Sequence, residues 1–392
     1  MRKTSLLLAS IAFAVMLAGG AALAASSEAG NPGNAEARDA VLDASMKALV
    51  ERRGGPPGAI AVVQRGNDRE VHAFGVSNLK RDLPMRADAR MRQASTSKAF
   101  NGAVALSLVD KGEMSLNDTI GEYLPGLPKS WHEVTLRQLL DHTSGLPNFT
   151  EDPGYLRALS ASPENAPTPR KLLSYVEDEP LNFEPGSDYR YSNSDNVAVG
   201  LMVRVATGDT YEEQLQEQVL GPLGLKETSL PRGVNLKPPY IHGYDNDPSE
   251  QPPEDISEVI ASGWPWAAGG MVSTPYDFND FVRGYVGGDL FSKKVRAQQR
   301  QVVPGGSSEP PGPGKNSAGL GIFRYETRCG TVWGHTGNYP GYTQFMAASP
   351  NGKRSVTVSV NEQLSPVEGA PGVFDALRRA EVRAVCAALA TR

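Results

Sequence analysis

The chain has 392 residues, 40% hydrophobic and 21% charged, so it can bury a sizeable core and is not a largely disordered protein. Its net charge of −5, with no basic block, lacks the electrostatic footprint of a nucleic-acid-binding protein. Two cysteines are too few for a small disulfide-rich scaffold or a cysteine-rich zinc site.

The N-terminal residues have the pattern of a secretory signal peptide. Arg2 and Lys3 precede an apolar run at 6–17, which leads into small residues around Ala24. The run is short of the roughly 20 apolar residues that span a bilayer. We therefore expect cleavage of residues 1–24 and a secreted or periplasmic mature protein with no transmembrane anchor.

The two cysteines of an exported chain meet an oxidising compartment, where Cys329 and Cys386 can pair. In the chain-entropy description, closing that loop would stabilise the fold by roughly 4 kcal/mol. The alternative is a pair of buried free thiols.

The first part of the chain predicts two helices separated by strands. In chain order these are a helix at 35–53, hairpin strands at 59–63 and 70–74, a short strand at 91–94 and a helix at 96–111. The hairpin turn contains Gly66, Asn67 and Asp68. The short strand runs directly into Ser95.

From residue 113 to about residue 300, short helical patterns are broken by proline and glycine. The candidate helices lie at 136–140, 196–205, 211–220 and 276–285. Two further stretches, at 244–255 and 304–315, are expected to be exposed loops.

Strand patterns return near the C-terminus. They lie at 331–333, 342–348 and 355–360, and an amphipathic helix follows at 374–389. Because sequential hairpins favour antiparallel pairing, we predict an α+β fold with one antiparallel sheet flanked by the N- and C-terminal helices. Residues 25–112 and 301–392 would form this sheet-containing part, and residues 113–300 a mainly helical inserted domain. A site is expected in the cleft between them.

Ser95 and Lys98 are the first candidate pair for chemistry, since the chain has no G-x-S-x-G elbow, Walker sequence or second zinc-ligating histidine after His132-Glu133. A serine at a helix start faces unpaired N–H groups, and a residue three positions on shares its face. Burial would lower the pKa of the lysine so that it accepts the serine proton. The plain alternative is a capping serine with a surface lysine.

Two more elements strengthen this hypothesis. Tyr191 precedes an apolar helix and could shuttle protons near Lys98, while the Asn193 amide could hold a substrate carbonyl or the lysine. Further on, a glycine-rich segment carries His335, Thr336, Gly337 and Asn338. There the N–H of Asn338 could face that of Ser95 as an oxyanion hole. Taken singly, each element also fits an ordinary packed residue.

The order Ser-x-x-Lys, Tyr-x-Asn, His-Thr-Gly resembles the class C β-lactamase-like serine hydrolases. That family includes D-alanyl-D-alanine carboxypeptidases, β-lactamases, D-amino-acid amidases and esterases. Supporting stretches lie at 110–116, 139–146 and 183–186. The likeness covers about residues 35–390 and is greatest to the secreted D-alanyl-D-alanine carboxypeptidases, which are low-molecular-weight penicillin-binding proteins. The stretch from Gly319 to Cys386 resembles them especially.

The resemblance implies a role for each matching residue. Ser95 looks like the acylated nucleophile, Lys98 and Tyr191 like its proton-transfer partners, and Asn193 like a ligand of the substrate amide. The remaining members would line the cleft: His335, Thr336, Gly337, the oxyanion-hole residue Asn338, and Trp264 as an aromatic wall. The carboxypeptidases also have a disulfide that Cys329 and Cys386 match in position.

One position departs from the carboxypeptidases, which place an arginine on the strand before the disulfide cysteine to bind the substrate carboxylate. Here Phe323 aligns with it, and Arg324 beside it would face the opposite side of the strand.

We therefore predict an exported serine hydrolase, preferably a D-alanyl-D-alanine carboxypeptidase acting on peptidoglycan peptides. The alternatives are an esterase or β-lactamase of the same family, or a non-catalytic penicillin-binding sensor module. The expected partner is a small peptide or β-lactam substrate and not nucleic acid. No metal or organic cofactor is implied, and the protein is expected to be a monomer.

Overall fold

A computed structural model describes residues 35–391, except 246, 248–250 and 368–369. The predicted signal peptide lies outside the described residues, so its cleavage stays a prediction. None of the helices that the structure describes combines the length and the apolar character needed to cross a bilayer.

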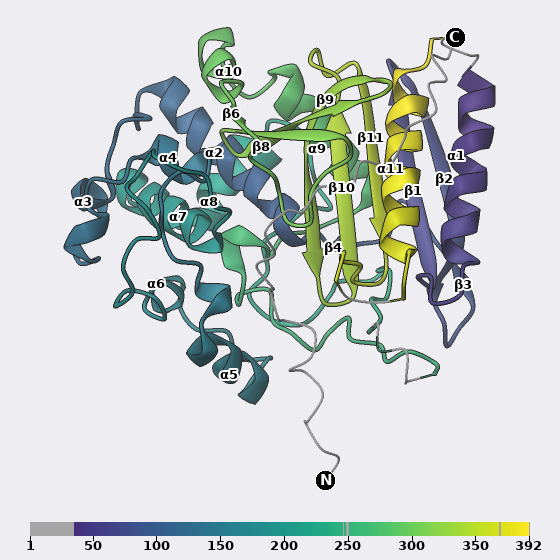
Figure 1. Cartoon of the computed structure of the whole chain (residues 1–392), viewed down its shortest axis with the longest axis horizontal. Coiled ribbons are helices and arrows are strands. Elements are labelled where there is room, and N and C mark those ends of the chain that lie inside the picture. Colours follow the sequence, from purple (N-terminus) through teal and green to yellow (C-terminus); the bar gives the residue numbers. More distant parts are fainter. Residues whose placement is uncertain (1–34, 246, 248–250, 368–369, 392) are drawn as a thin grey trace.

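A nine-stranded antiparallel sheet forms the centre of the fold (Figure 1). Its strands are β1 (Gly58–Arg65), β2 (Asp68–Asn78), β3 (Leu83–Pro84), β6 (Val303–Pro304), β7 (Lys315–Gly319), β8 (Ile322–Thr327), β9 (Gly330–Tyr339), β10 (Tyr342–Ala348) and β11 (Arg354–Val360). The spatial order is β3-β2-β1-β11-β10-β9-β8-β7-β6, so an N-terminal and a C-terminal strand pair at its middle. This confirms the predicted antiparallel sheet assembled from both ends of the chain.

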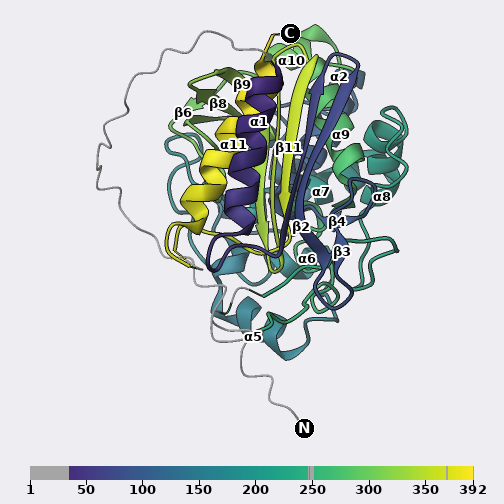
Figure 2. The same cartoon turned by 90° about the vertical axis from the view of Figure 1, so that its right-hand side faces the viewer.

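Two terminal helices cover one face of the sheet. These are α1 (Ala35–Val50) and α11 (Val373–Leu389), which lie side by side in Figure 2 and contact each other. The buried residues of α1 are spaced three or four apart, at Leu42, Met46 and Leu49, so one stripe of the helix faces inward. The other face is covered by α9 (Pro275–Gly287), which contacts β1, β10 and β11.

The long helix α2 (Ser97–Lys111) joins the sheet to the helical part of the molecule. Its residues from Ser97 to Leu108 are all buried, because it contacts β8 on one side and helices of the inserted part on others. Gly112 ends it with a φ of 77°, a left-handed conformation that glycine adopts without steric cost.

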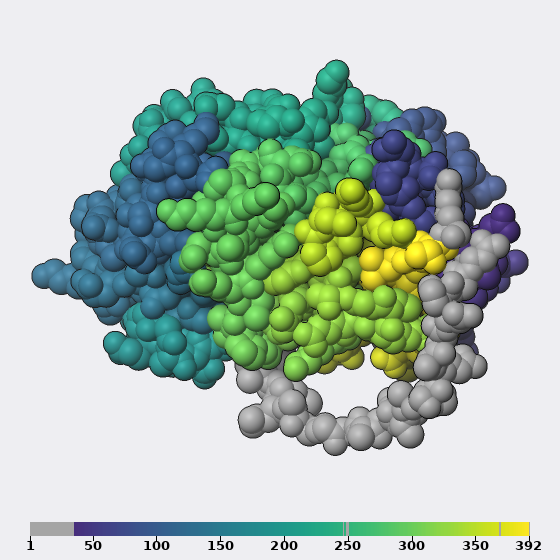
Figure 3. All heavy atoms as spheres, turned by 90° about the horizontal axis from the view of Figure 1, so that it is seen from above, coloured from purple at the N-terminus to yellow at the C-terminus, as the bar shows by residue number. Residues whose placement is uncertain are grey.

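The remaining helices are short except for α7 (Asn193–Thr207), which is as long as α2. The short ones are α3 (Ile120–Tyr123), α4 (Leu136–Leu140), α5 (Pro153–Ala161), α6 (Pro169–Leu173), α8 (Tyr211–Leu215) and α10 (Lys293–Gln299). Single turns lie at η1 (Ala94–Thr96), η2 (Lys129–Trp131), η3 (Phe149–Glu151), η4 (Gln216–Leu220) and η5 (Trp266–Ala268). Seen from above in Figure 3, this helical part (blue and teal) lies beside the C-terminal strands (green and yellow).

Three sequence-based expectations were wrong in detail. The strand expected at 91–94 is only β4 (Met91–Arg92), which pairs with β5 (Val272–Ser273) outside the main sheet. The strand ends at Arg92, and Ala94, with a φ of 52°, already begins η1. Strands β3, β5, β6 and β7 and helices α3, α5, α6 and α10 were not predicted, and β8 was expected only from the family resemblance. The segment 304–315, expected to be exposed, is partly buried, since its own residues Ser308 and Pro310 face inward.

The cysteine pair forms the predicted disulfide. Cys329 lies in the turn between β8 and β9, Cys386 lies in α11, and their Cα atoms are 5.2 Å apart. The bond therefore ties the last helix to the sheet.

Candidate active site

Ser95 stands where the chain bends from β4 into α2. The preceding residue, Ala94, has a positive φ of 52°, a conformation that costs an alanine energy and recurs at functional sites. Ser95 is half-buried and lines a cavity of about 310 Å³ between the sheet and the helical part. Its hydroxyl is therefore accessible from the cavity.

Lys98 is fully buried one helical turn beyond Ser95. Its Nζ donates to Ser95 Oγ at 3.1 Å, to Asn193 Oδ1 at 2.7 Å and to the Ala268 carbonyl at 2.7 Å. Burial lowers the pKa of the ammonium from 10.5 to about 7, although the charges of Glu309 and Asp195 oppose that shift. Near neutral pH, a substantial share of Lys98 is therefore neutral and able to accept the Ser95 proton.

Tyr191 lies against the same lysine. Lys98 Nζ is 4.9 Å from the centre of the Tyr191 ring, and the buried phenol oxygen has no hydrogen-bond partner among the described residues. Burial raises the pKa of Tyr191 well above 10, and the nearby Ser95 hydroxyl offsets only part of that rise. The phenol thus stays protonated and suits proton relay, which favours Lys98 over Tyr191 as the base.

Asn193, the first residue of α7, has its amide fixed by neighbours. Its Nδ2 donates to Asn148 Oδ1 at 3.2 Å and to Thr150 Oγ1 at 3.0 Å, which turns Oδ1 toward Lys98. Both amide hydrogens are used within the protein, so the group that Asn193 can offer a substrate is its oxygen.

The backbone of β9 runs closely past η1. A methyl group on Gly337 would come within 2.8 Å of the Gln93 carbonyl oxygen and 2.9 Å of the Ser95 nitrogen. Asn338, the next residue, lines the cavity beside Ser95. The structure therefore brings together the two backbone segments that were expected to form the oxyanion hole.

Gly337 and the two residues before it were expected to line the cleft, but they are not among the described residues that line the cavity. His335 and Thr336 lie behind this edge. Both are buried, and burial lowers the pKa of His335 well below 6.5, so the ring is neutral. His335 packs edge-on to Phe323 at 5.0 Å between ring centres. The Thr336 hydroxyl donates to the Pro310 carbonyl at 2.5 Å and so holds the segment that follows β6.

Aromatic side chains form one wall of the cavity. Trp264 is 2% exposed and meets Tyr155 edge-to-face at 5.5 Å between ring centres, and both line the cavity. This is where the sequence expected an aromatic wall.

Arg324 points away from the site. Its guanidinium pairs with Glu326 at 2.8 Å, and it is not a lining residue, whereas Phe323 is buried against His335. Phe323 and Arg324 were expected to face opposite sides of the sheet, because side chains alternate along a strand.

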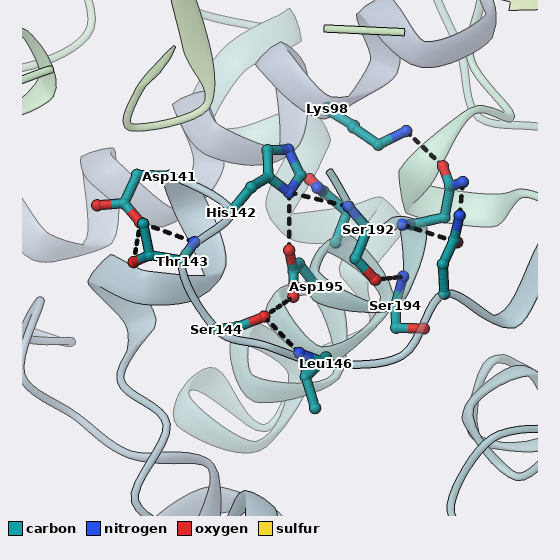
Figure 4. Close-up of polar contacts among 12 residues, drawn as sticks. Lys98, Asp141, His142, Thr143, Ser144, Leu146, Ser192, Ser194 and Asp195 are labelled. Carbon is teal, nitrogen blue, oxygen red and sulfur yellow. Dashed lines mark hydrogen bonds and ion pairs between the residues drawn. The ribbon is translucent and has the colours of Figure 1, made fainter. Parts of the chain in front are cut away.

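A second buried network lies behind Tyr191 and was not anticipated. His142 Nδ1 is 2.7 Å from Asp195 Oδ2, and Ser144 donates to Asp195 Oδ1 at 2.5 Å, as Figure 4 shows. The His142 ring lies 4.6 Å from that of Tyr191. Burial lowers the pKa of His142 to about 3, so it is neutral and can support the tyrosine without adding charge. The signal in the sequence was the stretch 139–146, to which no role had been given.

The described cavity lining holds no histidine or cysteine and only one carboxylate, Glu309, which is too few ligands for a metal centre. Elsewhere, Asp39, Glu70 and His72 lie close enough to share an ion. The Arg65 guanidinium already pairs with Asp39 at 2.6 Å and Glu70 at 2.7 Å, so both carboxylates have a cationic partner without a metal ion.

Comparison with known proteins gives a family match over most of the chain. The sequence profile of the Beta-lactamase family matches residues 42–378. Among curated proteins, Penicillin-binding protein 4* of Bacillus subtilis is 26% identical over 74% of this chain and 64% of its own length. A D-aminopeptidase of Brucella anthropi is 31% identical over 48% of this chain and 35% of its own length. The chain thus spans less than two thirds of these relatives.

Solved structures share the fold. A D-stereospecific amidohydrolase from Streptomyces has a TM-score of 0.73 and 29% identity, covering 83% of this chain and 94% of its own. An octameric penicillin-binding protein homologue from Pyrococcus abyssi has a TM-score of 0.69 and 21% identity, covering 87% and 76%. The expected monomer therefore finds no support and stays a prediction.

Proposed function

Because the chain belongs to the Beta-lactamase family of serine hydrolases, we propose that it cleaves amide bonds of D-amino acid derivatives through an acyl-enzyme on Ser95. The names of the relatives, which include a D-aminopeptidase and a D-stereospecific amidohydrolase, agree with this substrate class. The narrower assignment, a D-alanyl-D-alanine carboxypeptidase, requires a cation to bind the terminal carboxylate. No lysine or arginine lines the described part of the cavity, so the broader class is the better proposal.

The distance from Lys98 Nζ to Ser95 Oγ, 3.1 Å, is the observation that carries the proposal. A neutral, buried lysine at hydrogen-bond distance is the base that a serine nucleophile needs. Acylation starts when the Ser95 proton passes to Lys98 and Oγ forms a bond with the substrate carbonyl carbon. The N–H groups of Ser95 and Asn338 then bind the oxyanion.

The leaving group departs as an amine. The proton on Lys98 passes through the Tyr191 hydroxyl to the amide nitrogen, the C–N bond breaks, and the acyl group stays on Ser95. Water then attacks the ester, its proton takes the same route back to Ser95 Oγ, and the acid is released. The net reaction consumes one amide and one water and yields one acid and one amine.

The place of action belongs to the same proposal. A disulfide such as Cys329–Cys386 persists in oxidising compartments, which supports the export predicted from residues 1–24.

Mass spectrometry after incubation with a penicillin tests the nucleophile. We expect one covalent adduct in the wild type and none in Ser95→Ala. Ser77→Ala is the matched control, because Ser77 and Lys80 share the spacing but not the site, and it should be labelled like the wild type. An adduct that survives Ser95→Ala would refute the proposal. An adduct without turnover of any amide or ester would identify a sensor module instead.

A further inference from the structure

Glu309 is the one charged side chain among the described residues that line the cavity. It follows β6 in the segment that the sequence predicted to be an exposed loop, and it is half-buried. The same cavity is lined by Ser95, so a substrate in reach of the nucleophile meets this carboxylate.

The segment that carries Glu309 is fixed on both sides. Besides the bond from Thr336 to the Pro310 carbonyl, Ser308 Oγ also bonds to Pro310 O at 3.2 Å, and the Tyr189 hydroxyl donates to the Ser307 carbonyl at 2.6 Å. The position of Glu309 is therefore set by the fold and does not depend on a contact of its own side chain.

The carboxylate has no partner in the described structure. No hydrogen bond or ion pair joins it to another residue there. The nearby Arg190 is taken, because it pairs with Glu151 at 2.9 Å and donates to Asn182 Oδ1 at 2.6 Å. The Lys98 ammonium influences Glu309 only by its charge and makes no hydrogen bond to it, since its Nζ donates to Ser95, Asn193 and Ala268. Burial raises the pKa of Glu309 to about 7, because the ionised carboxylate has lost part of its hydration. A bound cation would compensate for that lost hydration.

We propose that Glu309 binds a positively charged amino group of the substrate, and that it thereby selects D-amino acid derivatives that carry a free primary amine. This rests on the proposed hydrolase function and specifies its substrate. One carboxylate between aromatic and proline residues suits a single ammonium group. It does not suit a hard metal ion, which needs several oxygen ligands.

The amine could come from two positions on such a substrate. It could be the α-amine next to the scissile carbonyl, as in a D-amino acid amide, or a side-chain amine further along a longer peptide. The chemistry at Glu309 is the same in both, and two pairs of substrates distinguish them.

The first pair is D-alanyl-p-nitroanilide and its N-acetyl derivative. The second is Nα-acetyl-L-lysyl-D-alanyl-D-alanine and its diacetyl derivative. With the wild type at about pH 7.5, we expect kcat/KM to favour the free amine in one of the pairs by about 10- to 100-fold, the range for a hydrogen bond between charged groups. In Glu309→Gln this preference, taken as the ratio of the two substrates within one variant, should fall to within about threefold, chiefly through KM.

Charge reversal sharpens the test. Glu309→Lys should reverse the preference in that pair, and Glu309→Asp should keep its sign. Glu326→Gln removes a carboxylate that pairs with Arg324 outside the cavity, and it should leave the preference unchanged. Melting temperatures within a few degrees of wild type establish that each variant is folded.

The outcomes separate the two claims. If the wild type turns over both members of each pair equally, or if Glu309→Gln keeps the preference, the Glu309 assignment is wrong while the hydrolase stands. If penicillin gives no adduct and no substrate of either pair is hydrolysed, the proposed function itself fails.

Discussion

The protonation of Lys98 is set by two opposing effects, of which burial is the larger. Burial removes water from the ammonium and lowers its pKa, while the carboxyl groups of Glu309 and Asp195 raise it. The result, a pKa of about 7, makes the lysine a base at the pH where the protein is expected to work. A surface lysine at the same spacing from a serine would remain charged.

The pH dependence of acylation follows from this balance. In the proposed mechanism the neutral form of Lys98 is the active one, so kcat/KM for an uncharged ester should rise with pH through about 7 and then level off. Glu309→Gln removes a carboxylate that holds the proton on Lys98, so the rise should move to lower pH. Rates measured from pH 5 to pH 9 check this. If the rise moved to higher pH or vanished in the variant, the titration behind it would belong to a group other than Lys98.

Tyr191→Phe should separate function from stability. The Tyr191 hydroxyl makes no hydrogen bond of ordinary geometry among the described residues and has only the Ser95 hydroxyl nearby, so removing it should change the free energy of unfolding by less than about 1 kcal/mol. Loss of proton relay should slow acylation by about 100-fold or more.

The matched control for this prediction is Tyr285→Phe. The buried Tyr285 hydroxyl donates to the Leu320 carbonyl at 3.2 Å and lies outside the cavity lining, so the opposite pattern is expected. The protein should lose about 1 kcal/mol of stability and keep its rate. Denaturant unfolding and penicillin labelling measure the two quantities. Equal effects of both variants on rate would remove the relay role.

The contact between β9 and η1 is the element-scale feature on which the proposed oxyanion hole depends. In Gly337→Ala, the new methyl group would meet the Gln93 carbonyl and Ser95 nitrogen at under 3.0 Å, so β9 must move away from η1. We expect acylation to fall by about 100- to 1,000-fold, as when an oxyanion-hole donor is lost. Gly126→Ala is the control, since a methyl group there meets nothing within 4 Å, and it should leave the rate of acylation unchanged. Normal acylation by Gly337→Ala would contradict this account of the hole.

Sequence patterns predicted the parts of the site that depend on local spacing. Ser95 and Lys98 are three residues apart at a helix start, so their proximity follows from helix geometry alone. Asp195 and His142 come from different elements, and only the packing of α7 brings the carboxylate to the ring. Glu309 was missed for a similar reason. Its proline- and glycine-rich segment looks like a surface loop, and the bond to Thr336 that fixes it joins residues far apart in the sequence.

The same distinction holds for the strands. β10 was predicted with its observed bounds, because it is an apolar run between turns, and all of its residues are buried. β7 was missed, since its sequence, Lys-Asn-Ser-Ala-Gly, has little strand propensity, and only pairing with β8 makes it a strand.

For the whole molecule, the chain order constrained the architecture strongly. Strand patterns at both ends left one sheet closed by β1 and β11 as the simplest arrangement, and it is the one observed. The position of the domain boundary is less constrained. Helix α9 lies within the segment 113–300 that was assigned to the helical domain, yet it packs on the sheet. We propose the division into 25–112 with 301–392 and 113–300 as a description of chain order, with α9 bridging the two.

Removing the disulfide measures how much the covalent link between α11 and the sheet stabilises the fold. Cys329–Cys386 spans 57 residues, so replacing both cysteines by serine should cost roughly 4 kcal/mol of unfolding free energy in the chain-entropy description. Neither cysteine lines the cavity, so kcat/KM of the folded variant should remain within about twofold of wild type. Urea unfolding and ester hydrolysis at 25 °C check both. Wild type treated with a thiol reductant should match the double variant. A loss of activity greater than the unfolded fraction explains would mean that α11 and β9 transmit strain to the site.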